Sequence, residues 1–364
     1  MPSPWILGLL LAASGTGAAE GTPSEPGSPA VYAVLPLRNL SEDAGAPATI
    51  QEALQRALEA RGAQFVERSV LEAQLRGRRV RYTDSLSMSD AKAIAAALGA
   101  EFVLAGTVLD FARGVEPRVA VSLRVLSSES GERVGSAVAA LRGEDFEGLL
   151  GLGRIEDERV LLASAVEQLL ESFDERGEPL ATNASPERRR RASPPEDGYG
   201  FMLADFDPAA LDRVALMPFS NRSAHPDAAQ ALAEFLGDAW YHSSGVRVIE
   251  PAEVRAALVR MAVRSTEFVD RRSLAKLGDE LGARYFVLGS IERFGETSFA
   301  GNDRLPEIEA TVQVVDVQSG RTMAAAGVCR RGDHEQTLLG LGAIRNPFEL
   351  AARTARELVA GLGG

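Results

Sequence analysis

The sequence contains few of the residues on which catalytic and metal sites most often depend. Its 364 residues include one cysteine, Cys329, and three histidines, His225, His242 and His334. A single cysteine excludes an intramolecular disulfide framework and any metal cluster with several cysteine ligands. Basic residues are also in the minority, with 39 Lys and Arg against 51 Asp and Glu, so the net charge is -12. This acidic balance argues against a dedicated nucleic-acid-binding protein. The composition favours a protein that is not an enzyme.

A short apolar run at the N-terminus is typical of an export signal. Residues Trp5 to Ala13 are apolar, and the small residues Gly17, Ala18 and Ala19 follow. The run is too short to cross a bilayer, which takes about 20 apolar residues, so we predict a signal peptide over residues 1–19. The alternative is a disordered N-terminal segment. No lipobox cysteine follows the run, and we expect a periplasmic protein with no transmembrane segment and at most peripheral membrane contact.

The remainder of the chain is an internal duplication. The segment Ala33–Ser41 returns as Ala215–Ser223 at an offset of 182 residues, and Leu98–Val108 returns as Leu281–Ile291 at an offset of 183. Further matches in the same order make chance similarity an inadequate explanation. We therefore predict two copies of one domain, a first repeat over residues 30–173 and a second repeat over residues 212–362.

The segment between the repeats, residues 174–208, is rich in charge, proline and glycine, which predicts a flexible, protease-accessible linker. It carries four consecutive arginines, Arg188 to Arg191. Such a cluster either binds an acidic surface or anionic lipid or is simply solvated, and solvation is the commoner case.

Each repeat is predicted to be a mixed α/β unit. A buried strand opens it, over 31–37 and 214–219, and ends at a proline followed by a polar turn. Helical spacing follows at Ile50, Leu54, Ala57 and Leu58. These βα connections favour a mixed sheet covered by helices.

The second half of each repeat is predicted to be antiparallel. Alternating apolar residues indicate a hairpin, with strands at 101–110 and 118–126 in the first repeat. The hairpin loop is expected at 111–117, and the longer equivalent at 294–306 in the second repeat. A third strand and a long amphipathic helix close the repeat. Hairpins mixed with βα connections exclude a purely doubly wound sheet.

The opening strands "VLPLRN" and "LMPFSNRS" and the block "LGA-FVL-G" resemble an envelope superfamily. It includes the amino-terminal domain of TolB, CsgG, FlgO and FlgT, and LpoB. The resemblance implies an anticodon-binding-like fold with helices on one side of a mixed sheet, and non-catalytic roles in envelope assembly or secretion. It covers most of both repeats, although the lipobox cysteine of CsgG-like subunits is missing and the tandem duplication is a departure.

The best candidate for a ligand or partner site is the loop after the first strand of each repeat, where α/β folds often bind ligands. It carries Asn39 and Ser41, and Asn221 and Ser223. The alternative, which we favour, is that these side chains satisfy backbone groups within the turn.

The sequence offers no catalytic residue, cofactor site or metal site. His225 is expected to be a solvated loop residue, and His242 and His334 have no paired ligand at metal-binding spacing. Cys329 is expected to be a small, at least half-buried side chain. We expect a non-catalytic envelope protein that binds other envelope proteins in assembly, secretion or outer-membrane complexes, with homo-oligomerisation possible. The alternative is a ligand-sensing or signalling accessory protein that uses the loop after the first strand.

Overall fold

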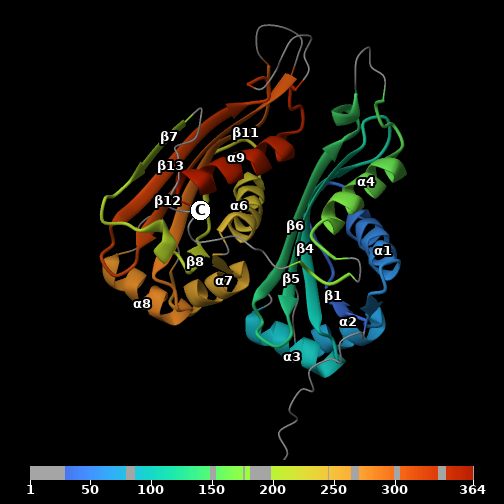
Figure 1. Cartoon of the computed structure of the whole chain (residues 1–364), viewed down its shortest axis with the longest axis horizontal. Coiled ribbons are helices and arrows are strands. Elements are labelled where there is room, and N and C mark those ends of the chain that lie inside the picture. The colour runs from blue at the N-terminus through green and yellow to red at the C-terminus, as the bar shows by residue number, and fades with distance from the viewer. Residues whose placement is uncertain are drawn as a thin grey trace, which may run out of the picture.

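Two sheets, each with its own helices, make up the molecule (Figure 1). The structure is a computed structural model, and it describes residues 29–78, 87–147, 153–174, 177–180, 198–244, 246–263, 270–298, 304–334 and 342–363. The predicted signal peptide and the Arg188–Arg191 cluster lie outside the described residues.

The first repeat forms a sheet of mixed direction. Strand β1 pairs in parallel with β3 and β4, and β4, β5 and β6 follow as an antiparallel meander, in the order β3-β1-β4-β5-β6. The elements are β1 (Val31–Val34), β2 (Arg38–Asn39), α1 (Ala46–Glu59), β3 (Gln64–Phe65), α2 (Arg68–Gly77), α3 (Met88–Leu98), β4 (Phe102–Ala112), β5 (Arg118–Ser127), β6 (Arg133–Arg142), the 3-10 helix η2 (Gly143–Phe146) and α4 (Glu158–Leu170).

The second repeat has the same element order and the same sheet order, β10-β8-β11-β12-β13, with one more strand, β7, at its edge. Its elements are β7 (Gly198–Met202), the 3-10 helix η4 (Pro208–Ala210), β8 (Arg213–Leu216), β9 (Ser220–Asn221), α6 (Ala228–Ser244), β10 (Arg247–Ile249), α7 (Pro251–Arg260), α8 (Arg271–Leu281), β11 (Tyr285–Ser298), β12 (Arg304–Asp316), β13 (Thr322–Arg331) and α9 (Pro347–Gly361). The predicted mixed α/β class is confirmed.

Local sequence signals account for the helices. Ile50, Leu54 and Leu58 form the buried face of α1. Helix α3 begins at an N-cap, Ser87, whose hydroxyl accepts a hydrogen bond from the Asp90 N–H at 3.0 Å. It ends at Gly99, whose φ of 64° is a left-handed conformation that glycine adopts without a steric penalty.

The helices cover both faces of the first sheet, contrary to the one-sided arrangement that the resemblance implied. Tyr32 and Val34 of β1 pack with α1 and α4, whereas Ala33 and Leu35 pack with α2 and α3. Because successive side chains of a strand point to opposite faces, this strand is buried on both sides. The continuous apolar sequence of this strand is the physical reason why helices cover both faces of the sheet here.

Three expected boundaries differ from the structure. The opening strand ends before Pro36 and resumes as β2, which pairs with β4. The hairpin of the second repeat is longer than expected, because the antiparallel register continues to Ser298 and Arg304. Part of the expected linker is ordered: β7 pairs with β13, and Phe206 is buried in the core of the second repeat. The repeat boundaries themselves stay a prediction.

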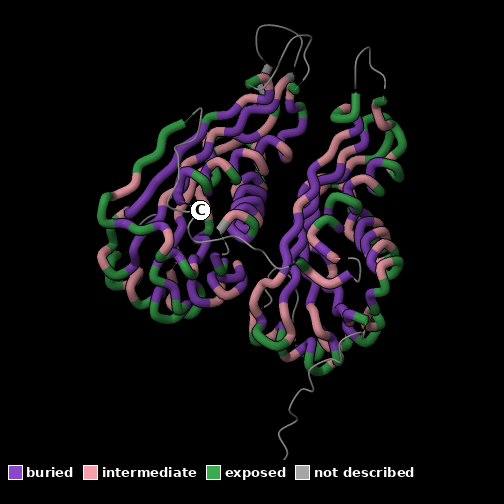
Figure 2. The backbone as a smooth tube through the Cα atoms, viewed as in Figure 1, coloured by how far each residue is buried: buried purple, intermediate pink, exposed green. Residues whose placement is uncertain are grey.

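The two repeats stack with helices between the sheets. Helices α6 and α9 lie between the two sheets, while α1 and α4 cover the opposite face of the first sheet (Figure 1). Strand β5 is consequently buried along both faces, as the tube coloured by burial shows (Figure 2). No helix among the described residues is both long and apolar enough to cross a membrane.

Candidate functional site

The turn that begins at Asn39, the last residue of β2, is closed by hydrogen bonds among the residues predicted as a site. The Ser41 N–H and hydroxyl both donate to the Asn39 Oδ1, at 3.0 and 2.7 Å, and the Asn39 amide donates to the Asp43 carbonyl at 2.9 Å. Asp43 in turn accepts from the Gly45 N–H at 2.7 Å and from the Arg113 Nε at 2.7 Å. The loop is thus an Asx turn tied to the β4–β5 hairpin.

The second repeat repeats this turn. Ser223 donates to the Asn221 Oδ1 from its N–H at 3.0 Å and from its hydroxyl at 2.8 Å, and the Asn221 amide donates to the His225 carbonyl at 2.8 Å. The His225 ring is not a freely solvated one as expected, because it packs against Phe294 and Phe348 at ring-centre distances of 5.0 and 5.7 Å. Aromatic burial was not visible in the sequence, since these rings are distant in the chain.

All four predicted side chains are therefore engaged in their own turns. Asn39 with Ser41, and Asn221 with Ser223, form two separate pairs on the two repeats. These hydrogen bonds agree with the turn interpretation that we favoured. A ligand role for these loops stays a prediction.

An extensive arrangement of polar groups lies where α6 rests on the first sheet, which we call the inter-repeat interface. Its apolar part is continuous with the core of the second repeat, because Leu109, Ala120 and Ala140 of the first sheet pack in the same cluster as Leu232 and Leu236 of α6. Small side chains on the sheet allow the helix to approach closely.

Two arginines of the sheet meet two glutamates of the second repeat in this interface. Arg133 donates to Glu250 Oε1 from Nε at 3.0 Å and from Nη2 at 2.9 Å, and Arg124 lies 3.5 Å from Glu250 and 3.6 Å from Glu234. All four side chains are at most 7% exposed. Burial acts to raise the pKa of Glu250, but Arg133 and Arg124 hold it below its ordinary value. The carboxylate is thus ionised and paired.

Hydroxyl groups complete the hydrogen bonding of the glutamate on α6. Thr107 and Ser122 donate to the two oxygens of Glu234, at 3.3 and 3.2 Å. Ser136 donates to Asp238, one helical turn further along α6, at 2.8 Å. A buried charge costs less when hydrogen bonds replace its lost hydration, and here three hydroxyl groups of the sheet donate to the acidic side chains of α6.

Side chains also cover the free edge of β6, the last strand of the first sheet. The Tyr241 hydroxyl donates to the Val134 carbonyl, and the Gln168 amide donates to the Val138 carbonyl at 3.4 Å. Between them, His242 Nε2 lies 2.9 Å from the Ser136 carbonyl. An exposed row of carbonyls invites pairing with another chain, so these contacts close this edge to strand addition.

His242 has an acidic partner that was not predicted from the sequence. Asp238, four residues earlier on α6, lies 3.5 Å from His242 Nε2. The hydrogen bond to the Asp238 carboxylate raises the pKa of His242 above its ordinary value, against the opposing effect of partial burial. Spacing of four residues on a helix was the signal available in the sequence.

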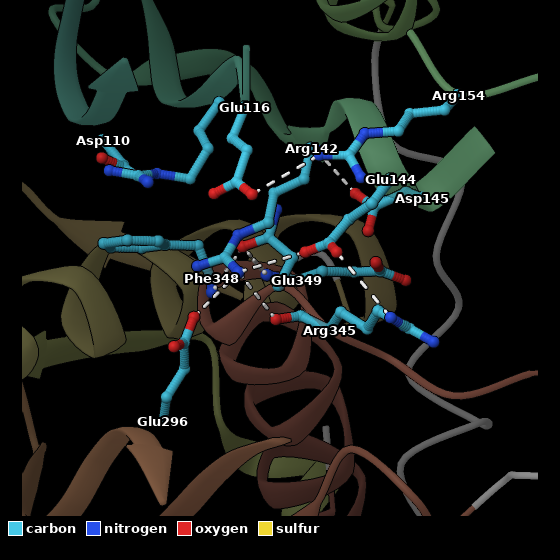
Figure 3. Close-up of polar contacts among 12 residues, drawn as sticks. Asp110, Glu116, Arg142, Glu144, Asp145, Arg154, Glu296, Arg345, Phe348 and Glu349 are labelled. Atoms are coloured by element: carbon cyan, nitrogen blue, oxygen red, sulfur yellow. Dashed lines mark hydrogen bonds and ion pairs between the residues drawn. The ribbon is translucent and has the colours of Figure 1, made fainter. Parts of the chain in front are cut away.

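At the other end of the interface, Arg142 joins the repeats (Figure 3). Its Nη1 donates to Glu296 at 2.9 Å and to the Arg345 carbonyl at 3.1 Å, both in the second repeat. Nearby Asp145 accepts the Arg142 N–H and is open to solvent on its outer side. Partial loss of hydration raises the pKa of Asp145 above its ordinary value, and the negative charge of Glu349 acts in the same direction. This end of the interface is crowded with carboxylates.

The outward face of the second sheet is the counterpart of the face that receives α6 in the first. There β7 places Tyr199 and Phe201, which are 55% and 47% exposed, beside Gly327 and Ala325 of β13. The Tyr199 ring lies over Gly327, where a Cβ would come within 2.3 Å of the ring, and its hydroxyl is 3.4 Å from Thr311. The tube coloured by burial shows β7 as exposed (Figure 2).

Cys329 lies on the same face and is exposed, contrary to the expected half-buried position. Partial loss of hydration and the negative charges of the nearby Glu307 and Glu309 raise the pKa of the Cys329 thiol above its ordinary value. The reason for the exposure is its alternation with Val328, which takes the inward position. Among the described residues, no group of three or more His, Cys, Asp or Glu side chains is placed to hold a metal ion.

No model of a known protein family matches the chain, and no curated protein sequence matches it. Among solved structures, the chain is similar to the PelC dodecamer from Paraburkholderia phytofirmans, at 16% identity and a TM-score of 0.30, over 46% of this chain and 96% of that one. It is also similar to lipoprotein GNA1162 from Neisseria meningitidis, at 18% identity and a TM-score of 0.28, over 36% of this chain and 89% of that one.

The LpoB C-terminal domain from Escherichia coli is also similar, at 21% identity and a TM-score of 0.26, over 32% of this chain and 87% of that one. Each of these solved chains corresponds to less than half of the protein. Similarity at this level does not identify a function. The finer assignment to the TolB amino-terminal and CsgG superfamily stays a proposal.

Proposed function

We propose that this protein is a non-catalytic component of the bacterial cell envelope, located in the periplasm, that binds other envelope proteins in assembly, secretion or outer-membrane-associated complexes. Homo-oligomers are included among these complexes. The export signal predicted at residues 1–19 supports the location. The observation that carries the interaction role is the outward face of the second sheet.

That face has the properties of a protein-binding surface. In the first repeat, the corresponding sheet face is covered by α6 and α9 and is buried. In the second repeat it presents two exposed aromatic side chains, Tyr199 and Phe201, beside the small residues Ala325 and Gly327. Aromatic residues are enriched in protein interfaces because they bury much area at low entropic cost.

A photo-crosslinking residue at position 199, in the chain expressed in its native host, tests the proposal. We expect a crosslink to an identifiable envelope protein or to a second copy of the chain, and loss of that crosslink in the Phe201→Ser variant. The matched control carries the same residue at Val160, which is 51% exposed on the outer side of α4. Equal yields from the two positions would contradict the proposal.

A further inference from the structure

A cavity of about 230 Å³ lies between the two repeats, at the end of the interface opposite to Arg142. The first repeat contributes Met88 at the start of α3 and residues Glu132 to Val134 at the start of β6. The second repeat contributes the last turns of α6 and the strands β8 and β10. The cavity therefore exists only where the two repeats meet.

The walls of the cavity are mainly apolar. Tyr241, Val246 and Val248 line it from the second repeat, and each is at most 8% exposed. Val134 and Met88 line it from the first repeat. Sites for small molecules are commonly of this type, apolar with a few polar groups that fix orientation.

Of the charged groups that line the cavity, one arginine has no ion-pair partner among the described residues. Glu250 is paired with Arg133, and Glu132 is paired with Arg247 at 3.1 Å. The guanidinium of half-buried Arg213, by contrast, forms no hydrogen bond or ion pair in the described part of the chain. Three arginines against two glutamates give the cavity an excess of one positive charge.

We propose that this cavity binds a small carboxylate with a compact apolar body, with Arg213 holding the carboxylate. A guanidinium is suited to the task because its two parallel N–H donors match the two oxygens of a carboxylate. The size is suitable, since a cavity of about 150 Å³ accommodates benzene. The chemistry is shared by a short fatty acid and by the C-terminus of a peptide that ends in an aliphatic residue.

Occupancy would strengthen the contact between the repeats. The ligand touches walls from both repeats, so it binds the stacked arrangement and not the separated one. The buried pair of Arg133 and Glu250 forms one side of the cavity, and the ligand would exclude water from it. The proposed ligand site is independent of the outward face on which the protein-binding role depends.

Calorimetric titration of the full chain with hexanoate and with 1-hexanol tests the charge requirement. We expect hexanoate to bind with a Kd below about 1 mM and the neutral alcohol to bind at least tenfold more weakly, because a hydrogen bond to a charged group is worth about tenfold or more. Equal affinity for the two probes, or no heat from hexanoate at 10 mM, would overturn the proposal.

Two variants assign the binding to this cavity. Arg213→Gln should weaken hexanoate binding at least tenfold with little change in the thermal unfolding midpoint, because Arg213 forms no hydrogen bond or ion pair in the part of the chain that the structure describes. Val248→Trp should fill the cavity and abolish binding, whereas Val259→Trp, at a site 78% exposed on α7, should have no effect. Unchanged binding in Arg213→Gln would refute the site, whatever the folding of the tryptophan variants.

N-acetyl-leucine and N-acetyl-leucinamide distinguish the two sources of the carboxylate. A peptide C-terminus would be identified if N-acetyl-leucine binds, N-acetyl-leucinamide does not bind, and hexanoate binds only weakly. Binding of hexanoate alone would identify a short fatty acid. In either case Arg213 is required, so both outcomes support the cavity as a carboxylate site.

Discussion

At the scale of single residues, equivalent positions of the two repeats have acquired different tasks. Glu52 on α1 and Glu234 on α6 correspond at the offset of 182 residues. Glu52 is exposed and pairs with Arg56 on its own helix, whereas Glu234 is buried against Arg124 of the first sheet. One residue type at one helical position is therefore a solvated side chain in one repeat and part of the interface in the other.

This pair gives a matched test of the interface. Glu234→Ala should lower the free energy of unfolding by about 3 kcal/mol, because it removes one partner of a buried charge and leaves two hydroxyl groups unsatisfied. Glu52→Ala should change it by less than about 0.5 kcal/mol, as for other exposed ion pairs. Urea unfolding followed by circular dichroism measures both, and equal losses would show that the interface ion pairs are unimportant.

A second prediction at this scale concerns pH. The pKa of His242 is raised by Asp238, so its stabilising effect is complete below the ordinary histidine pKa and is lost as pH rises through the raised value. The wild-type chain should therefore exceed His242→Gln in unfolding temperature at pH 5.5, with the difference shrinking by pH 8.5. Because the side chain is 47% exposed, we expect a modest effect. A difference that does not vary with pH would contradict it.

At the scale of secondary-structure elements, β7 depends on a glycine of its neighbour. The ring of Tyr199 occupies the space above Gly327, so any side chain there would displace it. In the first repeat the equivalent position is Val138, which instead packs against α6.

Gly327→Val should consequently release β7 from β13. We expect faster hydrogen exchange of the amides of residues 198–202, measured by mass spectrometry, with the rest of the second sheet unchanged. In a Tyr199→Ala chain the clash with a residue at position 327 is absent. Adding Gly327→Val to that chain should therefore increase the exchange of β7 less than it does in the wild-type chain. If Gly327→Val leaves the exchange of β7 unaltered, the contact is not what holds the strand.

The elements were largely predictable from sequence because their signals are local. Apolar periodicity gave α1 and the antiparallel hairpins, and the prolines marked the end of the opening strands. The interface was not predictable, since Ala120, Ser122 and Arg124 alternate with apolar residues as a solvent-exposed strand face would. Only the partner helix, more than 100 residues away, makes that face buried. The turn hydrogen bonds of Asn39 and Asn221 were predictable because they involve neighbouring residues.

At the scale of the whole molecule, the two repeats are held together by contacts as well as by the chain. A core cluster and buried ion pairs cross the interface, and α6 contributes residues to the cluster and to the ion pairs. We therefore expect the repeats to stay associated when the covalent connection between them is cut.

Limited trypsin digestion tests this association, because Arg188 to Arg191 offer cleavage sites between the repeats. The nicked protein should sediment as one species of unchanged mass at micromolar concentration, with two fragments on a denaturing gel. The same digestion of a variant carrying Glu234→Ala and Glu250→Ala should yield separated halves. Separation of the wild-type fragments would show that the linker, and not the interface, joins the repeats.

The two ends of the stacked molecule differ, because the interface joins the helices of the second repeat to the sheet of the first. A third repeat added by the same contact would rest on the second sheet, where Gln313 and Thr322 stand at the positions of Arg124 and Arg133. The free helix α1 carries Arg56 at the position of Asp238. Open-ended stacking by an unlike contact needs both ends to match. The sheet end has lost both arginines, whereas the helix end keeps Glu52 at the position of Glu234 and has lost only the acidic residue at the position of Asp238. We therefore expect that the second sheet, without these two arginines, does not accept a third repeat by this contact.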